Sequence, residues 1–89
     1  MNDTNFNTML TEIRKMQVPI ITVTNINNNF HDRCYIIIAD GKDKITTFVF
    51  DDDCLIKVNS IDMNFHSAIG IYSQTVLNNP GSTFRLISM

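Results

Sequence analysis

The stretch that decides the fold spans residues 34–58 and reads CYIIIADGKDKITTFVFDDDCLIKV. It holds three runs with the length and the apolar, β-branched composition of strands, at residues 34–39, 44–50 and 54–58. Turn-forming residues separate the runs, namely the segments DGKD at residues 40–43 and DDD at residues 51–53. We therefore predict an antiparallel meander of three strands. The first run is apolar at every position, which predicts a strand that is covered on both faces.

The residues before this meander predict one helix and one further strand. Apolar residues recur at three- and four-residue spacing from Phe6 to Met16, which is typical of an amphipathic helix. Pro19 ends this helix, and the β-branched residues 20–24 predict a strand. The Asn-rich stretch at residues 25–32 predicts a loop, because Asn is depleted in strands.

The residues after the meander predict a second helix and a last strand. Ser60 is the expected N-cap of the helix, and the breaker cluster NNPG at residues 78–81 ends it. Residues 83–87 alternate in polarity and predict a strand. At 100° per residue, the apolar side chains of the helix fall within one inward stripe formed by Ile61, Phe65, Ala68, Ile69, Tyr72 and Val76.

The predicted element order is α-β-β-β-β-α-β. Such an order is typical of the α+β class, with a mainly antiparallel five-stranded sheet packed against two helices. At 89 residues the chain has the length for one core, so we predict a single α+β domain that spans residues 1–89.

The composition argues against nucleic acid and membrane as partners. The net charge is −2, so no overall cationic field attracts phosphates, and nucleic-acid binding is disfavoured. No apolar run approaches the length of a membrane span, and the first residues lack the pattern of a secretory signal. We therefore expect a cytoplasmic protein. Its eleven asparagines point to an A/T-rich coding sequence of the kind found in bacteriophages and mobile elements.

No residue pattern in the chain predicts catalysis. The aspartates of residues 40–43 and 51–53 lie in turns at opposite ends of a meander, so we interpret them as solvated turn residues and not as a metal site. Cys34 and Cys54 lie in apolar runs, where a reduced and buried thiol is expected. His31 and His66 have no partner at catalytic or ligand spacing. We predict no enzyme, no catalytic residues, no metal, no cofactor and no small-molecule substrate.

Aromatic and basic residues alternate along the meander, as they do on sheets that stack RNA bases. Tyr35, Phe48 and Phe50 are the aromatic residues in question. The element order does not match that of an RNA-recognition fold, so packing in the core is the preferred interpretation of these rings.

The feature that carries a functional hypothesis is a gap in charge. No Lys, Arg, Asp or Glu occurs from Met63 to Phe84, a stretch that includes nearly all of the second helix. A solvated helix normally carries charged residues on its outer face. The outward, partner-binding strip that we predict consists of Met63, Ser67, Gly70, Ile71, Gln74 and Leu77.

Three interpretations of this strip compete. Loops of the same chain cover it, it forms a homodimer interface, or it binds another protein. Depletion of charge together with Met is typical of interface centres. The leading hypothesis is a small, non-enzymatic protein-binding effector or inhibitor that masks a surface of its partner and is encoded by a phage or mobile element. A homodimeric structural or accessory subunit and a nucleic-acid-binding regulator are the alternatives.

Overall fold

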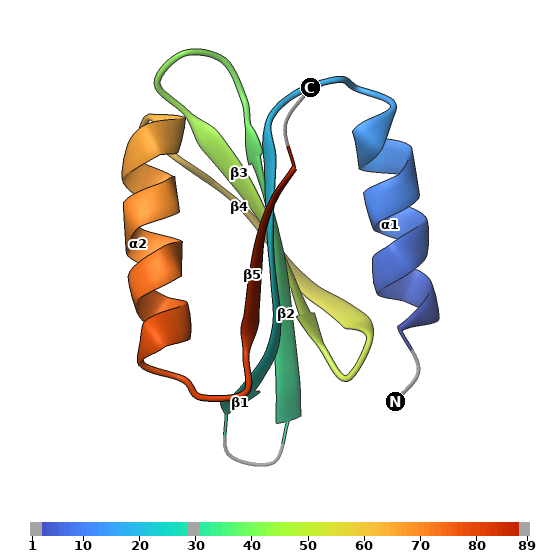
Figure 1. Ribbon diagram of the computed structural model, residues 1–89. Helices are drawn as coiled ribbons and strands as arrows, with labels where there is room; N and C mark the ends of the chain where they lie inside the picture. The colour runs from blue at the N-terminus through green and yellow to red at the C-terminus, as the bar shows by residue number, and fades with distance from the viewer. Residues whose placement is uncertain (1–2, 29–30, 88–89) are drawn as a thin grey trace.

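The computed structural model describes residues 3–28 and 31–87, and it has the predicted element order. The described elements are α1 (Thr4–Arg14), β1 (Ile20–Asn28), β2 (His31–Ala39), β3 (Ile45–Asp51), β4 (Cys54–Ile61), α2 (Phe65–Leu77) and β5 (Thr83–Ile87). The five strands form one sheet with the helices on opposite faces (Figure 1). The predicted α+β class and the five-stranded antiparallel sheet are therefore confirmed.

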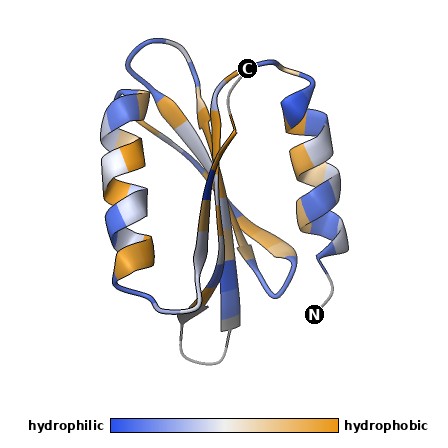
Figure 2. Ribbon diagram, in the orientation of Figure 1, coloured by the Kyte–Doolittle hydropathy of each residue, from blue (hydrophilic) through white to orange (hydrophobic). Residues whose placement is uncertain are grey.

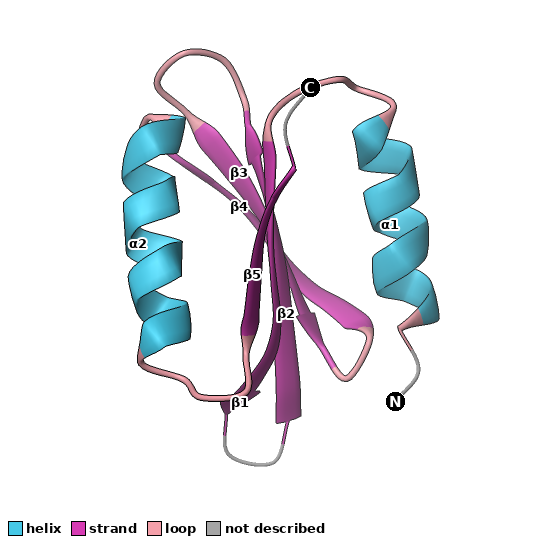
Figure 3. Ribbon diagram, in the orientation of Figure 1, coloured by secondary structure: helices cyan, strands magenta, loops and turns pink. Residues whose placement is uncertain are grey.

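The strand order in the sheet is β4-β3-β2-β1-β5, and every neighbouring pair is antiparallel. The first four strands follow one another as a meander. After β4 the chain crosses one face of the sheet as α2 and returns as β5 beside β1 (Figure 3). Strands β4 and β5 are thus the two edges of the sheet.

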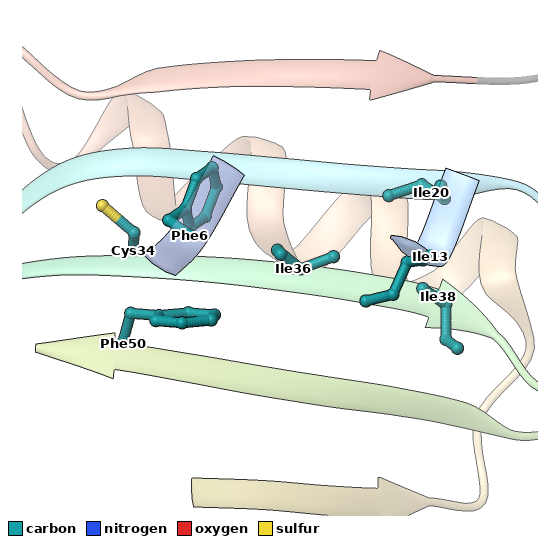
Figure 4. Close-up of a cluster of buried hydrophobic side chains, with 7 residues drawn as sticks. All are labelled: Phe6, Ile13, Ile20, Cys34, Ile36, Ile38 and Phe50. Carbon is teal, nitrogen blue, oxygen red and sulfur yellow. The ribbon is translucent and has the colours of Figure 1, made fainter. Parts of the chain in front are cut away.

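The central strand β2 has apolar side chains on both faces because a helix lies on each side of the sheet. Its residues Cys34, Ile36 and Ile38 face α1, and Figure 4 shows them beside side chains from α1, β1 and β3. This first core consists of Phe6, Ile13, Ile20, Cys34, Ile36, Ile38 and Phe50. The ring centroids of Phe6 and Phe50 lie 5.4 Å apart in an edge-on contact. Phe48 packs against the same core, so the packing interpretation of the two phenylalanines is confirmed.

The second core lies between the other face of the sheet and α2. Its buried members are Ile21, Val23, Ile26, Ile37, Ile45 and Ala68. The inward stripe of α2 packs against them with Phe65, Ile69, Tyr72 and Val76, as predicted. Ala68 is fully buried, so it marks the line along which α2 approaches the sheet.

The Asn-rich stretch is not a loop, and this prediction was wrong. Strand β1 continues to Asn28, and β2 already begins at His31, while residues 29 and 30 of the predicted loop lie outside the described residues. The register shifts between Val23 and Ile26, where Asn25 has a positive φ of 65°. This β-bulge turns Ile26 into the second core. Burial of that one side chain outweighs the low strand propensity of the neighbouring asparagines.

The predicted start of α2 was also wrong. Ser60 belongs to β4, which extends to Ile61, and the helix begins at Phe65. Asn64 is the N-cap, and its side-chain oxygen accepts a hydrogen bond of 2.8 Å from the backbone N–H of Ser67. Ser60 instead contacts the Thr46 hydroxyl at 3.1 Å across the β3–β4 ladder. Both Ser and Asn cap helices well, so residue type alone did not separate the two positions.

The aspartate triplet ties the β3–β4 hairpin to α1. Asp52 and Asp53 both have positive φ angles, as the two central residues of a type I′ hairpin turn do. The Asp53 carboxylate accepts hydrogen bonds from the backbone N–H groups of Asn5 and Phe6, each at 2.9 Å. The formal N-cap residue Asp3 makes no side-chain cap. Asp53 therefore supplies, from a turn 47 residues away, the acceptors that a helix N-terminus requires.

The other two aspartates of the triplet also make contacts across the sheet. Asp51 forms a two-bond ion pair with Arg33, at 2.8 Å to Nε and 3.1 Å to Nη2. Asp52 accepts a hydrogen bond of 3.1 Å from the backbone N–H of Asp32. The interpretation as turn residues is confirmed for Asp52 and Asp53, whereas the expectation that the triplet is only solvated was wrong. Each carboxylate has a partner outside its own turn.

We predict that Asp53→Asn lowers the free energy of unfolding by about 1 kcal/mol, the typical value of a helix cap. Asparagine tolerates the left-handed backbone but loses the charge and one of the two acceptor oxygens. Asp43→Asn, an exposed aspartate in the other hairpin turn, is the matched control and should change stability by less than about 0.5 kcal/mol. Urea unfolding followed by circular dichroism measures both. Equal effects of the two changes would contradict the capping role of Asp53.

The two cysteines differ in environment, which corrects the prediction that both are buried. Both thiols are free; Cys34 is buried in the first core, whereas Cys54 is exposed at the start of edge strand β4. Burial raises the pKa of the Cys34 thiol, so less of the reactive thiolate forms at a given pH. Position at an edge, and not apolar neighbours in the sequence, decides the exposure of Cys54.

We predict that Cys54 reacts rapidly with DTNB in the folded protein and that Cys34 reacts only as fast as the protein unfolds. Cys54→Ser should remove the rapid phase, and Cys34→Ser should remove the slow one. Rapid reaction of Cys34 in the Cys54→Ser variant would show that the first core is open to solvent.

Candidate functional site

The predicted strip on α2 is exposed. Ser67, Gly70 and Gln74 are exposed, and two large apolar residues of the strip, Ile71 and Leu77, are 49% and 75% exposed. The interpretation in which loops of the same chain cover the strip was therefore wrong. Both interpretations that require a second molecule remain.

Met63 does not belong to this strip, and its predicted place on the outer helix face was wrong. It precedes the N-cap Asn64, lies outside the helix and packs half-buried against the second core. The helix starts four residues later than predicted, so the helical spacing does not apply to position 63. From here on, the α2 strip denotes the exposed positions Ser67, Gly70, Ile71, Gln74 and Leu77.

The polar groups near the α2 strip are satisfied within the helix itself. The Ser73 hydroxyl donates to the Gly70 carbonyl at 3.1 Å, and the Thr75 hydroxyl donates to the Ile71 carbonyl at 3.0 Å. The Ser73 and Thr75 hydroxyl groups beside the strip are thus bonded within the helix, and no strip position carries a charged residue. Helix α1 differs, because its exposed face carries a Glu12–Lys15 ion pair of 3.2 Å. Figure 2 shows the hydropathy of both helices: α2 has pale and orange segments together with blue ones, and the outer side of α1 has blue segments.

Gly70 lies in the middle of α2, and nothing in the folded chain requires a glycine at this position. A Cβ atom at this position would meet no atom within 4 Å, and the backbone has no positive φ there. Glycine inside a helix costs about 0.5–1 kcal/mol relative to alanine. No contact within the chain offsets this loss of helix stability. Close approach of a second molecule is one situation in which the missing side chain matters.

A groove opens beside α2 on the same face of the sheet. Helix α2 contacts β1 and β5, so part of β3 and β4 on this face has no helix over it. The groove has a volume of about 390 Å³. Its lining comes from β2, β3, β4 and α2 and consists of Arg33, Tyr35, Thr47, Val49, Ile56, Lys57, Asn59, Ile61, Tyr72 and Thr75. The sequence pattern did not predict this groove, because it depends on where α2 lies across the sheet.

The charges that line the groove are both positive. Arg33 is bound to Asp51 as described, and its hydrogen bonds to Asp51 and then Tyr35 raise the pKa of the guanidinium. Lys57 is exposed, and no described residue forms an ion pair with it. Within residues 3–28 and 31–87, no Asp or Glu belongs to the lining. The groove is therefore a locally cationic site on a chain whose net charge is negative.

Two tyrosines line the groove where α2 meets the sheet. The rings of Tyr35 on β2 and Tyr72 on α2 have centroids 5.8 Å apart and are tilted by 57°. Both side chains are only half-buried. Aromatic residues with a polar end are enriched in protein interfaces, because they provide apolar area together with a hydrogen-bonding group.

Edge strand β4 is exposed along most of its length. Leu55, Ile56 and Val58 are 42%, 52% and 54% exposed. Sequence reasoning recognised the strand but not its position at the edge, and therefore missed this surface. A signal was present, since a strand at the end of a meander has only one neighbour unless a later strand joins it.

Comparisons with known proteins do not assign a function. No protein-family model, no curated protein and no solved structure matches the chain. Among the described residues, no group of three or more His, Cys, Asp or Glu is placed to hold a metal ion. None of the described helices has the length and apolar character to cross a membrane. The geometry of the α2 strip, the groove and β4 is therefore the basis for a function.

Adjacent threonines on β3 differ in their hydrogen bonding. Thr47, on the groove side, is 4% exposed, and its hydroxyl has no hydrogen-bond partner in the described structure. Thr46, on the α1 side, donates to the Asp40 carboxylate at 3.0 Å and contacts the Ser60 hydroxyl at 3.1 Å. A buried hydroxyl without a partner costs about 1–3 kcal/mol.

We predict that Thr47→Val raises the free energy of unfolding by about 1 kcal/mol, because it removes an unsatisfied hydroxyl and keeps a β-branched side chain. Thr46→Val is the matched control and should lower stability by about 1 kcal/mol, because it removes two hydrogen bonds of a buried residue. Urea unfolding of the two variants measures the difference. Loss of stability in Thr47→Val would mean that its hydroxyl is bonded in solution.

Proposed function

We propose that this chain is a small, non-enzymatic protein-binding module of the cytoplasm that acts by covering a surface of its partner. The observation that carries the proposal is the α2 strip, where Ile71 and Leu77 are exposed on a helix face without any charged residue. Exposed apolar surface with little charge is typical of the centre of protein interfaces. Gly70 adds support, because it destabilises the helix and no contact within the chain requires a glycine there.

A partner protein is favoured over a second copy as the occupant. Among the described residues, the charged side chains that line the groove beside the strip are both basic, and two copies would bring the same positive charges together there. An acidic segment of another protein fits this arrangement better. Inhibition of a host protein by a phage or mobile-element effector is the form of such masking that we propose.

Charge placed on the α2 strip tests the proposal. We predict that Ser67→Glu and Gln74→Lys leave the fold intact, within about 0.5 kcal/mol, because both positions face water. The signs suit the helix dipole, with the acid near the N-terminus and the base near the C-terminus. Either charge would be desolvated in an interface, so binding should weaken at least tenfold, or about 1.4 kcal/mol. Quantitative affinity capture and sedimentation equilibrium, for partner and self-association respectively, provide the measurement.

Two control variants calibrate this test. Thr11→Lys places the same positive charge as Gln74→Lys on the exposed side of α1 and should leave binding unchanged. Ala68→Glu buries a charge in the second core and should unfold the protein. If Gln74→Lys behaves like Thr11→Lys in every binding measurement, the α2 strip is ordinary surface and the proposal fails. If sedimentation shows a dimer that Gln74→Lys dissociates, the partner is a second copy.

Gly70→Ala is the mildest variant of the strip. The added methyl group meets nothing in the chain, so the free energy of unfolding should rise by about 0.5–1 kcal/mol. Weaker binding by this stabilised variant would show that a partner approaches the helix backbone at Gly70.

A further inference from the structure

Strand β4 exposes apolar side chains on both faces of the sheet. Leu55 pairs with Phe50 and Val58 pairs with Phe48, so both lie on the α1 side. Ile56 lines the groove on the opposite side. A ligand confined to the groove would cover Ile56 alone. A strand added beside β4 would cover all three, because its side chains alternate between the two faces.

The edge of β4 lacks most features that prevent strand addition. The strand is eight residues long, contains no proline and carries Lys57 as its single charged residue. It does have a register shift opposite Val49 and Phe50, which makes Ile56 a bulge residue and places Ile56 and Lys57 on the same face. Within the described residues β4 pairs only with β3, so its outer backbone N–H and C=O groups have no strand partner. The other edge strand, β5, is five residues long and is closed off by α2 on one face.

We propose that an extended, acidic segment of a partner protein adds to β4 as a sixth strand and places an apolar side chain in the groove beside Ile56 and an acidic side chain at Lys57. This inference rests on the protein-binding function proposed above and specifies the element of the partner that is bound. Main-chain hydrogen bonds to β4 supply affinity, and the groove supplies specificity.

Charge favours an acidic segment. Arg33 is already bound to Asp51, but Lys57 has no ion-pair partner among the described residues and stands where the groove meets the edge. None of the described carboxylates lines the groove, so none competes there for Lys57. An acidic side chain on the added strand, on the same face as Lys57, forms a cross-strand ion pair.

The positive charge of Lys57 also disfavours a second copy of the chain as the added strand. In a symmetric antiparallel pairing of two β4 strands, opposed side chains point to the same face. Two-fold registers centred on Lys57 or on Val58 place Lys57 opposite Lys57 of the other copy or opposite its Asn59. The Cβ atoms of the two lysines then lie about 5–8 Å apart, and like charges at such positions are destabilising. A heterologous acidic strand avoids this repulsion.

A display library of random peptides as long as β4, selected on the full chain, tests the inference. We expect enriched peptides to be apolar at alternate positions and to contain Asp or Glu. Selection on Lys57→Glu should enrich Lys or Arg at the corresponding position, because the charge of the site is inverted. Ile56→Thr keeps strand propensity and removes the apolar contact, so it should weaken an enriched peptide at least about tenfold. Leu77→Gln, on the α2 strip, is the matched control and should leave the peptide affinity unchanged.

Three outcomes would overturn the inference. One is the absence of enrichment above an unrelated protein. Another is enriched peptides whose charge ignores Lys57→Glu and whose affinity falls with Leu77→Gln; these bind the α2 strip, so the protein-binding function survives and the β4 site does not. The third is a dimer in sedimentation that Ile56→Thr dissociates, which assigns the edge to a second copy. Failure of the proposed protein-binding function is distinguished by a different measurement, the effect of Gln74→Lys on the capture of a partner protein.

Discussion

Burial of β2 on both faces is the constraint on which the rest of the structure depends. Ile36 and Ile37 are adjacent in the chain, point to opposite sides of the sheet and are both fully buried. Each face therefore needs a helix. Five strands span roughly 20 Å, whereas a helix is about 10 Å wide, so one helix covers only about half of a face. The groove beside α2 and the exposed edge at β4 are consequences of this mismatch in width.

The position of α1 on its face is fixed by a polar contact as well as by apolar packing. Phe6 and Ile13 hold the inner side of the helix against the sheet, and Asp53 holds its N-terminus at the β3–β4 turn. Two charge-assisted hydrogen bonds to backbone N–H groups set the direction in which α1 lies, which apolar side chains alone do not. The same turn brings Asp51 to Arg33, so one hairpin end organises both α1 and the rim of the groove.

The element order could be predicted from the sequence because the clear hydrophobic patterns agree with the way the elements pack. The double-sided apolar run of β2 and the inward stripe of α2 are both set by period and side-chain type. The wrong predictions concern positions whose local structure is determined by residues that are distant in the sequence. Asn25 enters a bulge because Ile26 has a core to fill, and Asp53 becomes a helix cap because α1 lies above its turn. Cys54 is exposed because none of the described strands lies on the outer side of β4, and that depends on β5 pairing with β1 instead.

The α2 strip and β4 are parts of one surface, and the groove joins them. Ile71 and Thr75 are one helical turn apart on the same flank of α2, and Thr75 lines the groove. Ile71 therefore lies on the groove-side flank of α2 without lining the groove itself, whereas Leu77 lies on the opposite flank of the helix. A strand added outside β4 lies four strand spacings from β1, roughly 19 Å, whereas α2 packs on β1 and β5, so this strand alone reaches neither apolar residue of the strip. A partner that covers both apolar residues of the strip must bring a second element across the outer face of α2, over the place where Gly70 leaves room for it.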